Sequence, residues 1–358
     1  MKDIGSIFPL YDSDFAGLGT ETWISDAGST AYYSLCREAF AVIARHLDDT
    51  NRKVLIPAYT CDTVITPFKE QGWDCYYYPI DNKLKIDTGA VLTLCSKLDF
   101  DLMLVHPYYG MDLGEEEIAL LREVRSKGCK LVVDLTQCIF SKQRLDFVDY
   151  YVGSYRKWFS IPDGAFLEAK TSSSIFVEEL HENESFVSLQ TDAMYLRGLY
   201  FSTDNEEVKS ISRRLNKMAN GMVDADVQPH KMAMVSRQLL QQEDVEKNQQ
   251  RRLDNFRFLF EHLKGIESCK LLWDDMSEVS TAPLYFTIFV SDRSELQAEL
   301  AAQHIYAPVI WPVVYEEVLV NDVVRSIYDT ILAIPIDQRY DQTDMMKIVG
   351  IIKKHYHD

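Results

Sequence analysis

The stretch KLVVDLTQ, residues 130–137, ends an apolar segment with a carboxylate. Lys130 to Val133 has the pattern of a buried strand, and Asp134 follows at its end. A buried carboxylate is costly unless a partner compensates its charge. Asp134 could hold a protonated ring nitrogen of a bound group, with Gln137 nearby at i+3, or it could cap the turn that follows. Both interpretations stay open at this point.

A second candidate is the lysine in VGSYRKWFSIPDGAF, residues 152–166. A strand leads into Ser154, Lys157 follows three residues later, and a glycine turn is expected at Gly164. A lysine at a strand end in an apolar segment can have a lowered pKa, which makes its amine a nucleophile for carbonyl groups. A lysine that is merely solvated is the commoner alternative.

Small residues in DAGSTAY, residues 26–32, could bind an anion. The residues are Gly28, Ser29 and Thr30, and they stand at the start of a segment with helical periodicity, STAYYSLCREAFAVIARHL. The open backbone N–H groups and the dipole of a helix start attract anions. An ordinary helix cap explains the same residues and is favoured for this stretch alone.

An aromatic residue follows the strand in IPAYTCDTV, residues 56–64. Tyr59 and Cys61 stand where the strand ends. A ring at this place could stack on a flat ligand, although an aromatic residue at a strand end more often belongs to the core.

These candidates lie at the ends of elements that alternate between strand and helix. Apolar runs predict strands at residues 54–58, 75–79, 102–106, 131–134 and 150–154. The stretch GEEEIALLREVRSKG predicts an amphipathic helix with acidic residues at its start, basic residues near its end and Gly128 as its stop. This alternation predicts an α/β fold with a mostly parallel sheet and helices on both faces. Ligands bind such sheets at the carboxyl ends of the strands.

The second half of the chain has a different pattern. EEVKSISRRLNKMANGM and SRQLLQQEDVEKNQQRRLDNFRFLFEHL are long, polar and helical, and the second is expected to be one helix that leads to the next domain. PLYFTIFV, SELQAELAAQ, APVIW and ILAIPI then predict strand, helix, strand and strand before a terminal helix. We expect a large α/β domain over residues 1–245 and a small α+β domain over residues 246–358.

Composition excludes some classes of partner. The chain has 358 residues and a formal net charge of −18, which argues against binding to nucleic acid or an anionic membrane. The sequence has no apolar run long enough for a transmembrane helix, and its start lacks the apolar core of a signal peptide. Seven scattered cysteines without a C-x-x-C pair favour a reduced, cytoplasmic protein with neither a disulfide framework nor a metal site.

Taken in chain order, the four candidate stretches resemble the pyridoxal-phosphate enzymes of fold type I, and among these the DegT-type sugar aminotransferases most closely. IPAYTCDTVITPFKEQGWDCYYYPID is similar to the strand-helix-strand of that family, LVHPYYGMD to its vH-x-x-G strand end, and VVDLTQC to its E-D-x-A-(Q/H) stretch. GIESCKLLW, APLYFTIFV and HIYAPVIWP look like its small domain. The resemblance covers nearly the whole chain.

The resemblance implies pyridoxal 5'-phosphate as the cofactor. By this resemblance Asp134 pairs with the pyridinium nitrogen, Gln137 contacts the ring hydroxyl, and Lys157 binds the cofactor covalently and moves a proton as a base. The implied phosphate-binding residues are Gly28, Ser29 and Ser154, with Thr30 as a further candidate.

The sequence departs from the family pattern in three places. The family usually has an aromatic residue at the position of Cys61, so stacking falls to Tyr59 or to a thinner contact with Cys61. The interval from Asp134 to Lys157 is short, and Ser154-x-x-Lys157 replaces the family's S-F-x-x-x-K. DADVQPHKMAM stands where the family has G-x-N-x-R-M, a segment that usually reaches into the neighbouring subunit's site. These departures concern the substrate more than the cofactor.

The function implied is an aminotransferase that transfers an amine from a donor such as glutamate to a nucleotide-linked keto sugar for polysaccharide or glycan synthesis. A homodimer is also implied, and the long helical stretch between residues 205 and 260 is expected to supply much of its contact. One alternative is elimination or dehydration with the same cofactor, although the related sugar dehydratases have histidine at the position of Lys157. The other is a non-catalytic binding or regulatory member of the fold, which the missing neighbour-subunit segment slightly favours. Arg339 could anchor a substrate, but a structural role is the commoner one.

Overall fold

The protein divides into two compact units. The computed structural model describes residues 3–16, 18, 29–47, 51–170, 180–225 and 228–357. The first unit contains Ser6–Asp48 and Asp149–Asp244, and the second contains Asp3–Gly5, Asp49–Val148 and Val245–Asp358. Each unit is a compact group of residues that contact one another. The expected domains at 1–245 and 246–358 stay a prediction.

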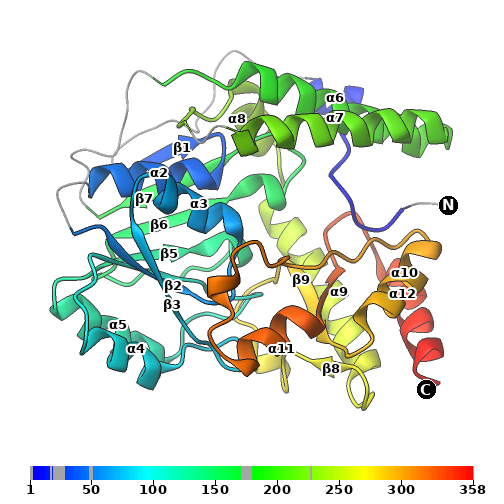
Figure 1. Ribbon diagram of the computed structural model, residues 1–358. Coiled ribbons are helices and arrows are strands. Elements are labelled where there is room, and N and C mark those ends of the chain that lie inside the picture. The colour runs from blue at the N-terminus through cyan, green and yellow to red at the C-terminus, as the bar shows by residue number, and fades with distance from the viewer. Residues whose placement is uncertain are drawn as a thin grey trace. The chain divides into compact units, whose positions relative to one another are not determined.

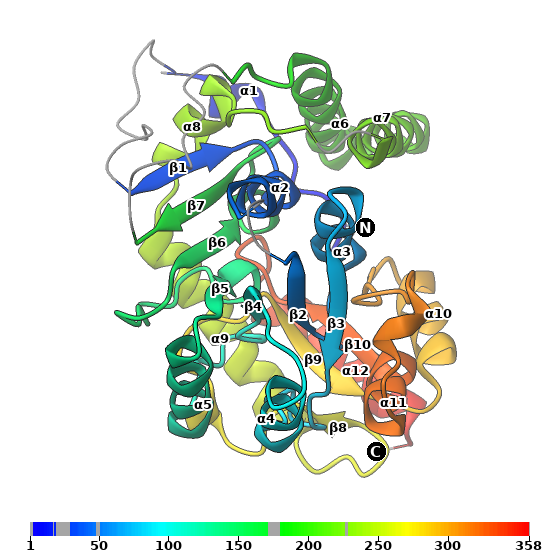
Figure 2. The same ribbon diagram turned by 60° about the vertical axis from the view of Figure 1, so that its left-hand side comes forward.

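Three antiparallel strands and a helical hairpin form the framework of the first unit (Figure 1). Strand β7 (Ala165–Ala169) pairs with both β1 (Thr30–Tyr33) and β6 (Tyr150–Ser154). Helices α6 (Glu184–Thr203) and α7 (Glu206–Ala225) lie side by side, as Figure 2 shows almost end-on. The unit also contains α1 (Asp12–Phe15), α2 (Cys36–His46) and α8 (Met234–Gln241).

Four parallel strands form the framework of the second unit. They follow the order β5-β4-β2-β3, and all their pairings are parallel. Their bounds are Lys53–Pro57 for β2, Asp74–Tyr78 for β3, Leu102–Val105 for β4 and Lys130–Asp134 for β5. Strands β2, β4 and β5 are apolar and buried almost throughout, as is typical of parallel strands covered on both faces. The connecting helices are α3 (Asp62–Glu70), α4 (Thr88–Cys95) and α5 (Glu115–Ser126).

The rest of the second unit is built on a small antiparallel sheet in the order β10-β9-β8. Its strands are β8 (Lys270–Leu271), β9 (Tyr285–Phe289) and β10 (Ile331–Pro335). The accompanying helices are α9 (Val245–Leu263), α10 (Arg293–Ala302), α11 (Asp322–Thr330) and α12 (Gln342–His355). Helix α9 packs along α12.

The predicted fold class is confirmed. Seven strands in the order β1-β7-β6-β5-β4-β2-β3 form a mixed, mostly parallel sheet flanked by helices, and a small α+β part follows it in the chain. All five predicted strands of the large sheet are present within a residue or two of the expected bounds.

Three predicted elements were wrong. The helix expected to follow DAGSTAY begins only at Cys36, because residues 30–33 alternate between half-buried and buried side chains and pair as strand β1. The helix expected over residues 236–263 is two helices, α8 and α9, and Asp244 stands just before the second, where a carboxylate favours a helix start. APVIW forms no strand; it contains Pro308, which has no N–H to donate to a sheet.

Candidate functional site

Asp134 lies at the carboxyl end of β5 and uses its two carboxylate oxygens differently. Its side chain is buried, and Oδ1 accepts a hydrogen bond of 2.9 Å from the backbone N–H of Thr136. This bond caps the short 3-10 helix η1 (Leu135–Gln137). Oδ2 lies 3.4 Å from Nδ1 of His106. The capping interpretation is therefore correct for one oxygen and leaves the other for a different role.

His106 follows β4 and connects Asp134 to Thr60. Its Nε2 lies 2.7 Å from Oγ1 of Thr60, while its Nδ1 faces the carboxylate. Burial alone would raise the pKa of Asp134, but the hydrogen bond and charge of His106, together with the hydrogen bonds of Thr136, hold that pKa below its usual value. Asp134 is therefore ionised at neutral pH, as a partner of a cationic ring nitrogen must be.

Gln137 supplies a hydrogen-bond donor that has no partner. Its Oε1 accepts a hydrogen bond of 3.3 Å from the backbone N–H of Tyr109. Its Nε2 is buried and makes no hydrogen bond with any residue that the structure describes. A buried unsatisfied donor is costly, and an acceptor on a bound ligand would satisfy it.

Aromatic rings surround this end of the sheet. The ring of Tyr59 lies 5.1 Å from that of Trp311 and 5.7 Å from that of Tyr108, between centroids. Tyr59 is 0% exposed, so its position is that of a core residue. Trp311 is half-buried and lies 6.1 Å from the imidazole of His106. Cys61 is half-buried just before α3, and the assignment of the stacking contact to Tyr59 or Cys61 stays a prediction.

Ser154 and Lys157 belong to the first unit. Ser154 is the last residue of β6, and Lys157 comes three residues later. Ser154 is buried, and its side chain does not cap the 3-10 helix η2 (Tyr155–Lys157) that begins after it. Backbone N–H groups of Tyr155 and Arg156 both donate to the carbonyl of Gly164, which holds the turn closed. Lys157 is exposed, and its amine has no hydrogen bond or ion pair with the described part of the chain. Its amine is therefore available for a ligand.

The residues predicted to bind phosphate are placed differently from one another. Gly28 lies outside the described residues. Ser29 precedes β1 and does not begin a helix, because Thr30 already belongs to the strand. The backbone carbonyl of Ser29 instead accepts a hydrogen bond of 2.8 Å from Ala169. The expectation of a helix N-terminus at these residues was wrong, and their contact with phosphate stays a prediction.

The segment that replaces the family's neighbour-reaching motif has a defined place in the first unit. Its residues 230–232 run along β1: the N–H of Ser34 donates to His230, and the N–H of Met232 donates to Tyr32. Lys231 forms isolated bridges with Tyr33 and Glu182. The segment thus extends the pairing of β1 within its own unit.

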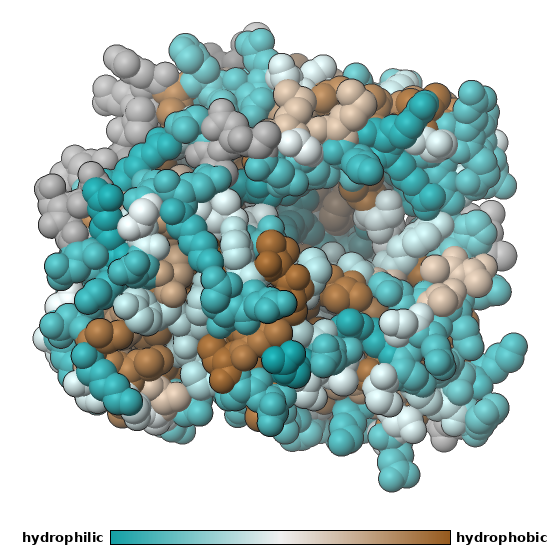
Figure 3. All heavy atoms as spheres, viewed as in Figure 1, coloured by the Kyte–Doolittle hydropathy of each residue, from teal (hydrophilic) through white to brown (hydrophobic). Residues whose placement is uncertain are grey.

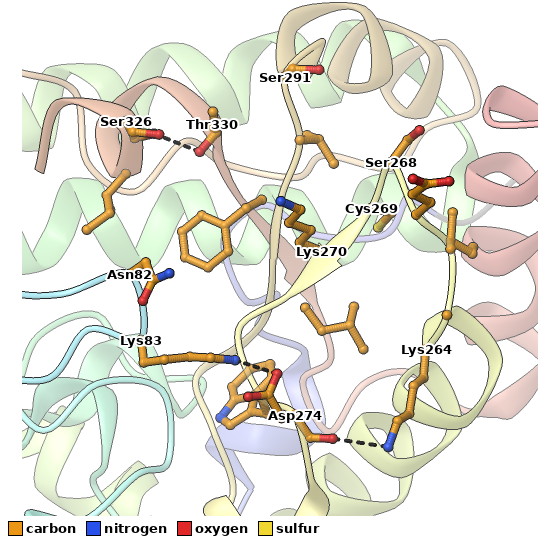
Figure 4. Close-up of a pocket in the computed structure, with 18 of the residues that line it drawn as sticks. Asn82, Lys83, Lys264, Ser268, Cys269, Lys270, Asp274, Ser291, Ser326 and Thr330 are labelled. Carbon is orange, nitrogen blue, oxygen red and sulfur yellow. Dashed lines mark hydrogen bonds and ion pairs between the residues drawn. The ribbon is translucent and has the colours of Figure 1, made fainter. Parts of the chain in front are cut away.

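A hollow of about 1010 Å³ lies beside β8 and contains none of the candidate site residues (Figure 4). The amine of Lys83 donates to Asp274 at 2.7 Å and to the carbonyl of Leu272 at 3.0 Å. The amine of Lys264 donates to the carbonyl of Asp274. These lysines satisfy backbone and carboxylate groups beside an edge strand, which is a structural role.

Arg339 also has a structural environment. Its guanidinium makes a two-pronged ion pair with Asp337, at 2.7 and 2.8 Å, in the turn that follows β10.

Within the described ranges, no three His, Cys, Asp or Glu side chains are arranged to hold a metal ion. Likewise, none of the helices in those ranges is both long and apolar enough to span a membrane.

No model of a protein family matches the sequence, and a search of characterised proteins by sequence finds no relative. Solved structures do match. The PMP-form of the putative sugar aminotransferase Spr1654 from Streptococcus pneumoniae has a TM-score of 0.69 at 12% identity, over 99% of this chain and 98% of that one. The chain has the same fold as this protein.

Two further structures support this assignment of the fold. Helicobacter pylori PseC, an aminotransferase involved in the biosynthesis of pseudoaminic acid, has a TM-score of 0.68 at 10% identity, over 99% of this chain and 100% of that one. DesV from S. venezuelae, solved with a ketimine intermediate, has a TM-score of 0.65 at 14% identity, over 92% and 85%.

The sequence predicted roles for Asp134, Gln137 and Lys157, which stay predictions, and gave no role to His106 or Thr60. The available signal was weak: both are polar residues just past the carboxyl ends of parallel strands, β4 and β2. Their contact with each other depends on the pairing of these strands, which the sequence does not state.

Proposed function

We propose that the protein is a pyridoxal-phosphate-dependent aminotransferase. We propose further that its acceptor is a nucleotide-linked keto sugar for polysaccharide or glycan synthesis, and that it works as a cytoplasmic homodimer. The fold, shared with sugar aminotransferases over nearly the full length of both chains, supports the reaction class. Spr1654, a matching protein of this fold, has been solved in PLP and PMP forms, which supports the cofactor.

The observation that carries the proposal is the pair of polar groups at the end of β5. Asp134 is buried, yet His106 and Thr136 hold its pKa low. Gln137 keeps a buried amide nitrogen without an acceptor. A pyridinium ring needs an anionic partner at its nitrogen, and its neighbouring hydroxyl can accept a hydrogen bond. The two side chains therefore fit this cofactor.

The remaining roles are those that the resemblance to the family implies. Pyridoxal phosphate supplies an aldehyde that binds amines and a ring that accepts electrons when a substrate proton leaves. Asp134 keeps a negative charge beside the ring nitrogen, and Gln137 orients the ring. Lys157 provides the amine that binds the cofactor and carries the substrate proton. The proposed phosphate ligands are Gly28, Ser29, Thr30 and Ser154.

A spectrum and a labelling experiment test this proposal. The protein incubated with pyridoxal phosphate is expected to be yellow, and borohydride is expected to fix the cofactor to Lys157. Peptide mapping then identifies the labelled lysine. A label on Lys53 or Lys142 would contradict the assignment. Lys157→Ala should still bind the cofactor but lose transamination by several orders of magnitude.

The same material separates the alternative functions. A colourless protein that cannot be reconstituted would support a non-catalytic binding or regulatory role. A coloured protein that gives no conversion of the cofactor with glutamate or other amino donors, but releases a keto product from a substrate, would support elimination or dehydration.

A further inference from the structure

The hydroxyl of Tyr328 lies among three backbone groups just past the end of β2. It accepts a hydrogen bond of 3.1 Å from the N–H of Thr60, and it lies 3.0 Å from the carbonyl of Ala58 and 3.2 Å from the carbonyl of Thr60. The side chain is buried, and its ring meets that of Tyr59 edge-on at 5.1 Å. A residue of α11 thus fixes the backbone where β2 ends.

The hydroxyl of Tyr328 stays protonated. Burial raises its pKa above the usual value, so at any working pH the group can donate to one carbonyl while it accepts from the N–H of Thr60. Within the described part of the chain, the hydroxyl of Tyr328 is the acceptor of the Thr60 N–H.

From Thr60 the contacts continue to Asp134. Asp134 is ionised and accepts hydrogen bonds only, so the proton between it and His106 must be on Nδ1 of the imidazole. On the other side of the ring, Nε2 lies 2.7 Å from the hydroxyl of Thr60. The imidazole therefore lies between Asp134 and Thr60, and the position of Thr60 bears on the orientation of the ring.

We propose that Tyr328 is a positioning residue for Asp134 and acts through Thr60 and His106. This rests on the proposed function, in which Asp134 faces the ring nitrogen of the cofactor. Without the hydroxyl of Tyr328, the N–H of Thr60 loses its acceptor and the end of β2 can move. The hydroxyl of Thr60 then leaves Nε2, the imidazole is free to turn, and Asp134 loses the donor at Oδ2.

Tyr340 provides a matched control in the same unit. It is also buried, and its hydroxyl also bridges backbone groups, accepting from the N–H of Gly5 at 2.7 Å and lying 3.4 Å from the carbonyl of Gly5. The backbone groups that its hydroxyl bridges belong to Gly5, whereas those around the hydroxyl of Tyr328 belong to Ala58 and Thr60. Tyr340→Phe therefore removes the same kind of bond without touching the chain of contacts.

The experiment compares Tyr328→Phe with Tyr340→Phe in the full-length protein. For each we measure the dissociation constant for pyridoxal phosphate and the pH midpoint of the absorbance change of the bound cofactor. Tyr328→Phe is expected to weaken binding about tenfold and to shift the midpoint by about one pH unit. Tyr340→Phe is expected to change binding less than about twofold, while both variants lose a similar amount of thermal stability.

A double-mutant cycle with His106→Asn tests whether Tyr328 acts on Asp134 through the imidazole of His106. Tyr328→Phe should add little to the change already made by His106→Asn. Full additivity, or a Tyr328→Phe protein that behaves like Tyr340→Phe, would overturn the inference and leave the proposed function intact. A wild-type protein that binds no pyridoxal phosphate would remove the proposed function and the inference together.

If Tyr328→Phe does not fold, Thr60 provides the same test. Thr60→Ser keeps the hydroxyl, and Thr60→Val keeps the shape without it. The inference requires Thr60→Ser to bind the cofactor nearly as the wild type does, and Thr60→Val to show the weaker binding and the shifted midpoint. Equal behaviour of the two variants would contradict it.

Discussion

At the scale of single residues, Asp134 shows what the sequence can and cannot predict. Its position at a strand end predicted a buried carboxylate with a partner, and its spacing to the following turn predicted the cap that Oδ1 makes with Thr136. The contact with His106 was not predictable. It depends on the pairing of β4 with β5, which brings residues distant in the sequence to the same sheet edge.

The substitution Asp134→Asn distinguishes the negative charge of this side chain from its role as the cap of η1. Asparagine keeps the shape and can still cap η1, but it removes the negative charge. We expect transamination to fall by about two to four orders of magnitude, which corresponds to about 3–5 kcal/mol of transition-state stabilisation. The cofactor should stay bound, and Asp134→Glu should retain more activity. Rates of the half-reaction with glutamate and melting temperatures provide the measurement. A folded Asn variant with near-normal turnover would leave Asp134 only its capping role.

Asp163 predicts a pH dependence of stability in the first unit. It is 0% exposed, and its carboxylate accepts a hydrogen bond of 3.2 Å from the N–H of Ala233. Burial raises its pKa from 3.8 to about 7. Folding therefore takes up a proton between these values, and stability falls as the pH rises from about 4 to about 7 and then stays constant.

Asp163→Asn should remove most of that loss. Asparagine keeps an oxygen for the N–H of Ala233 and does not ionise. At pH 8 the variant is expected to be more stable than the wild type, by at most about 4 kcal/mol. Urea denaturation of the cofactor-free protein at pH 5, 6 and 8 gives the comparison. Parallel curves for the two proteins would contradict the assignment. Burial also raises the pKa of Glu38, which contributes to the slope in both proteins.

At the scale of elements, the sequence predicted strands that are apolar throughout and helices with clear ends. Helix α5 begins after Gly114 and ends before Gly128, which has a φ of 99°, as the charge pattern and the glycine had indicated. Local sequence patterns predicted the wrong element where pairing between distant segments determines the structure. Residues 30–33 fit a helical period, but their pairing with β7 makes them a strand.

Helix α6 contains a glycine that the neighbouring segment requires. The N–H of Leu10 donates to the carbonyl of Met194 at 3.0 Å, and a Cβ on Gly198 would overlap the carbonyl oxygen of Leu10. Gly198→Ala is therefore expected to destabilise the protein by about 1–3 kcal/mol, despite the better helix propensity of alanine. Limited proteolysis should then cut the segment around Leu10 more rapidly.

Gly221 in α7 is the matched control. A Cβ at this position meets nothing within 4 Å, so Gly221→Ala is expected to stabilise the protein by about 0.5–1 kcal/mol. Urea denaturation midpoints of the two variants check both directions. A stabilised Gly198→Ala protein would show that the segment around Leu10 does not pack against α6.

At the scale of the whole molecule, identities of 10–14% accompany a fold shared over nearly the full length of the chains. Apolar strands and helices of suitable length tolerate many sequences, which explains why the resemblance of a few stretches sufficed to predict the fold. The substrate depends on side chains around a site, and the sequence departs from the family pattern at Cys61 and at residues 224–234. Sequence therefore predicted the framework, whereas the roles of Asp134 and Gln137 and the identity of the acceptor stay predictions.

The surface of α7 indicates where a second subunit would bind. A stripe of apolar residues at heptad spacing is partly or largely exposed along this helix: Val208, Ile211, Leu215, Met218 and Met222. Figure 3 shows brown and tan atoms gathered over the region that Figure 1 labels α6 and α7. A continuous exposed apolar stripe is typical of an interface. The sequence had predicted that residues 205–260 supply much of the dimer contact, and α7 is the part of that range with this surface.

We therefore expect a homodimer that depends on Met218 and Met222, which are 56% and 42% exposed. Replacing both with glutamate places charges in the proposed contact, where burial without a partner is costly, and should shift the protein to monomers at micromolar concentration. Met346→Glu, at an equally exposed methionine of α12, is the control and should leave the dimer unchanged. Sedimentation velocity measures all three proteins with cofactor bound. A monomeric wild type would contradict the dimer, whereas a Met218→Glu, Met222→Glu protein that stays dimeric would place the contact on another surface and leave the stripe of α7 without this role.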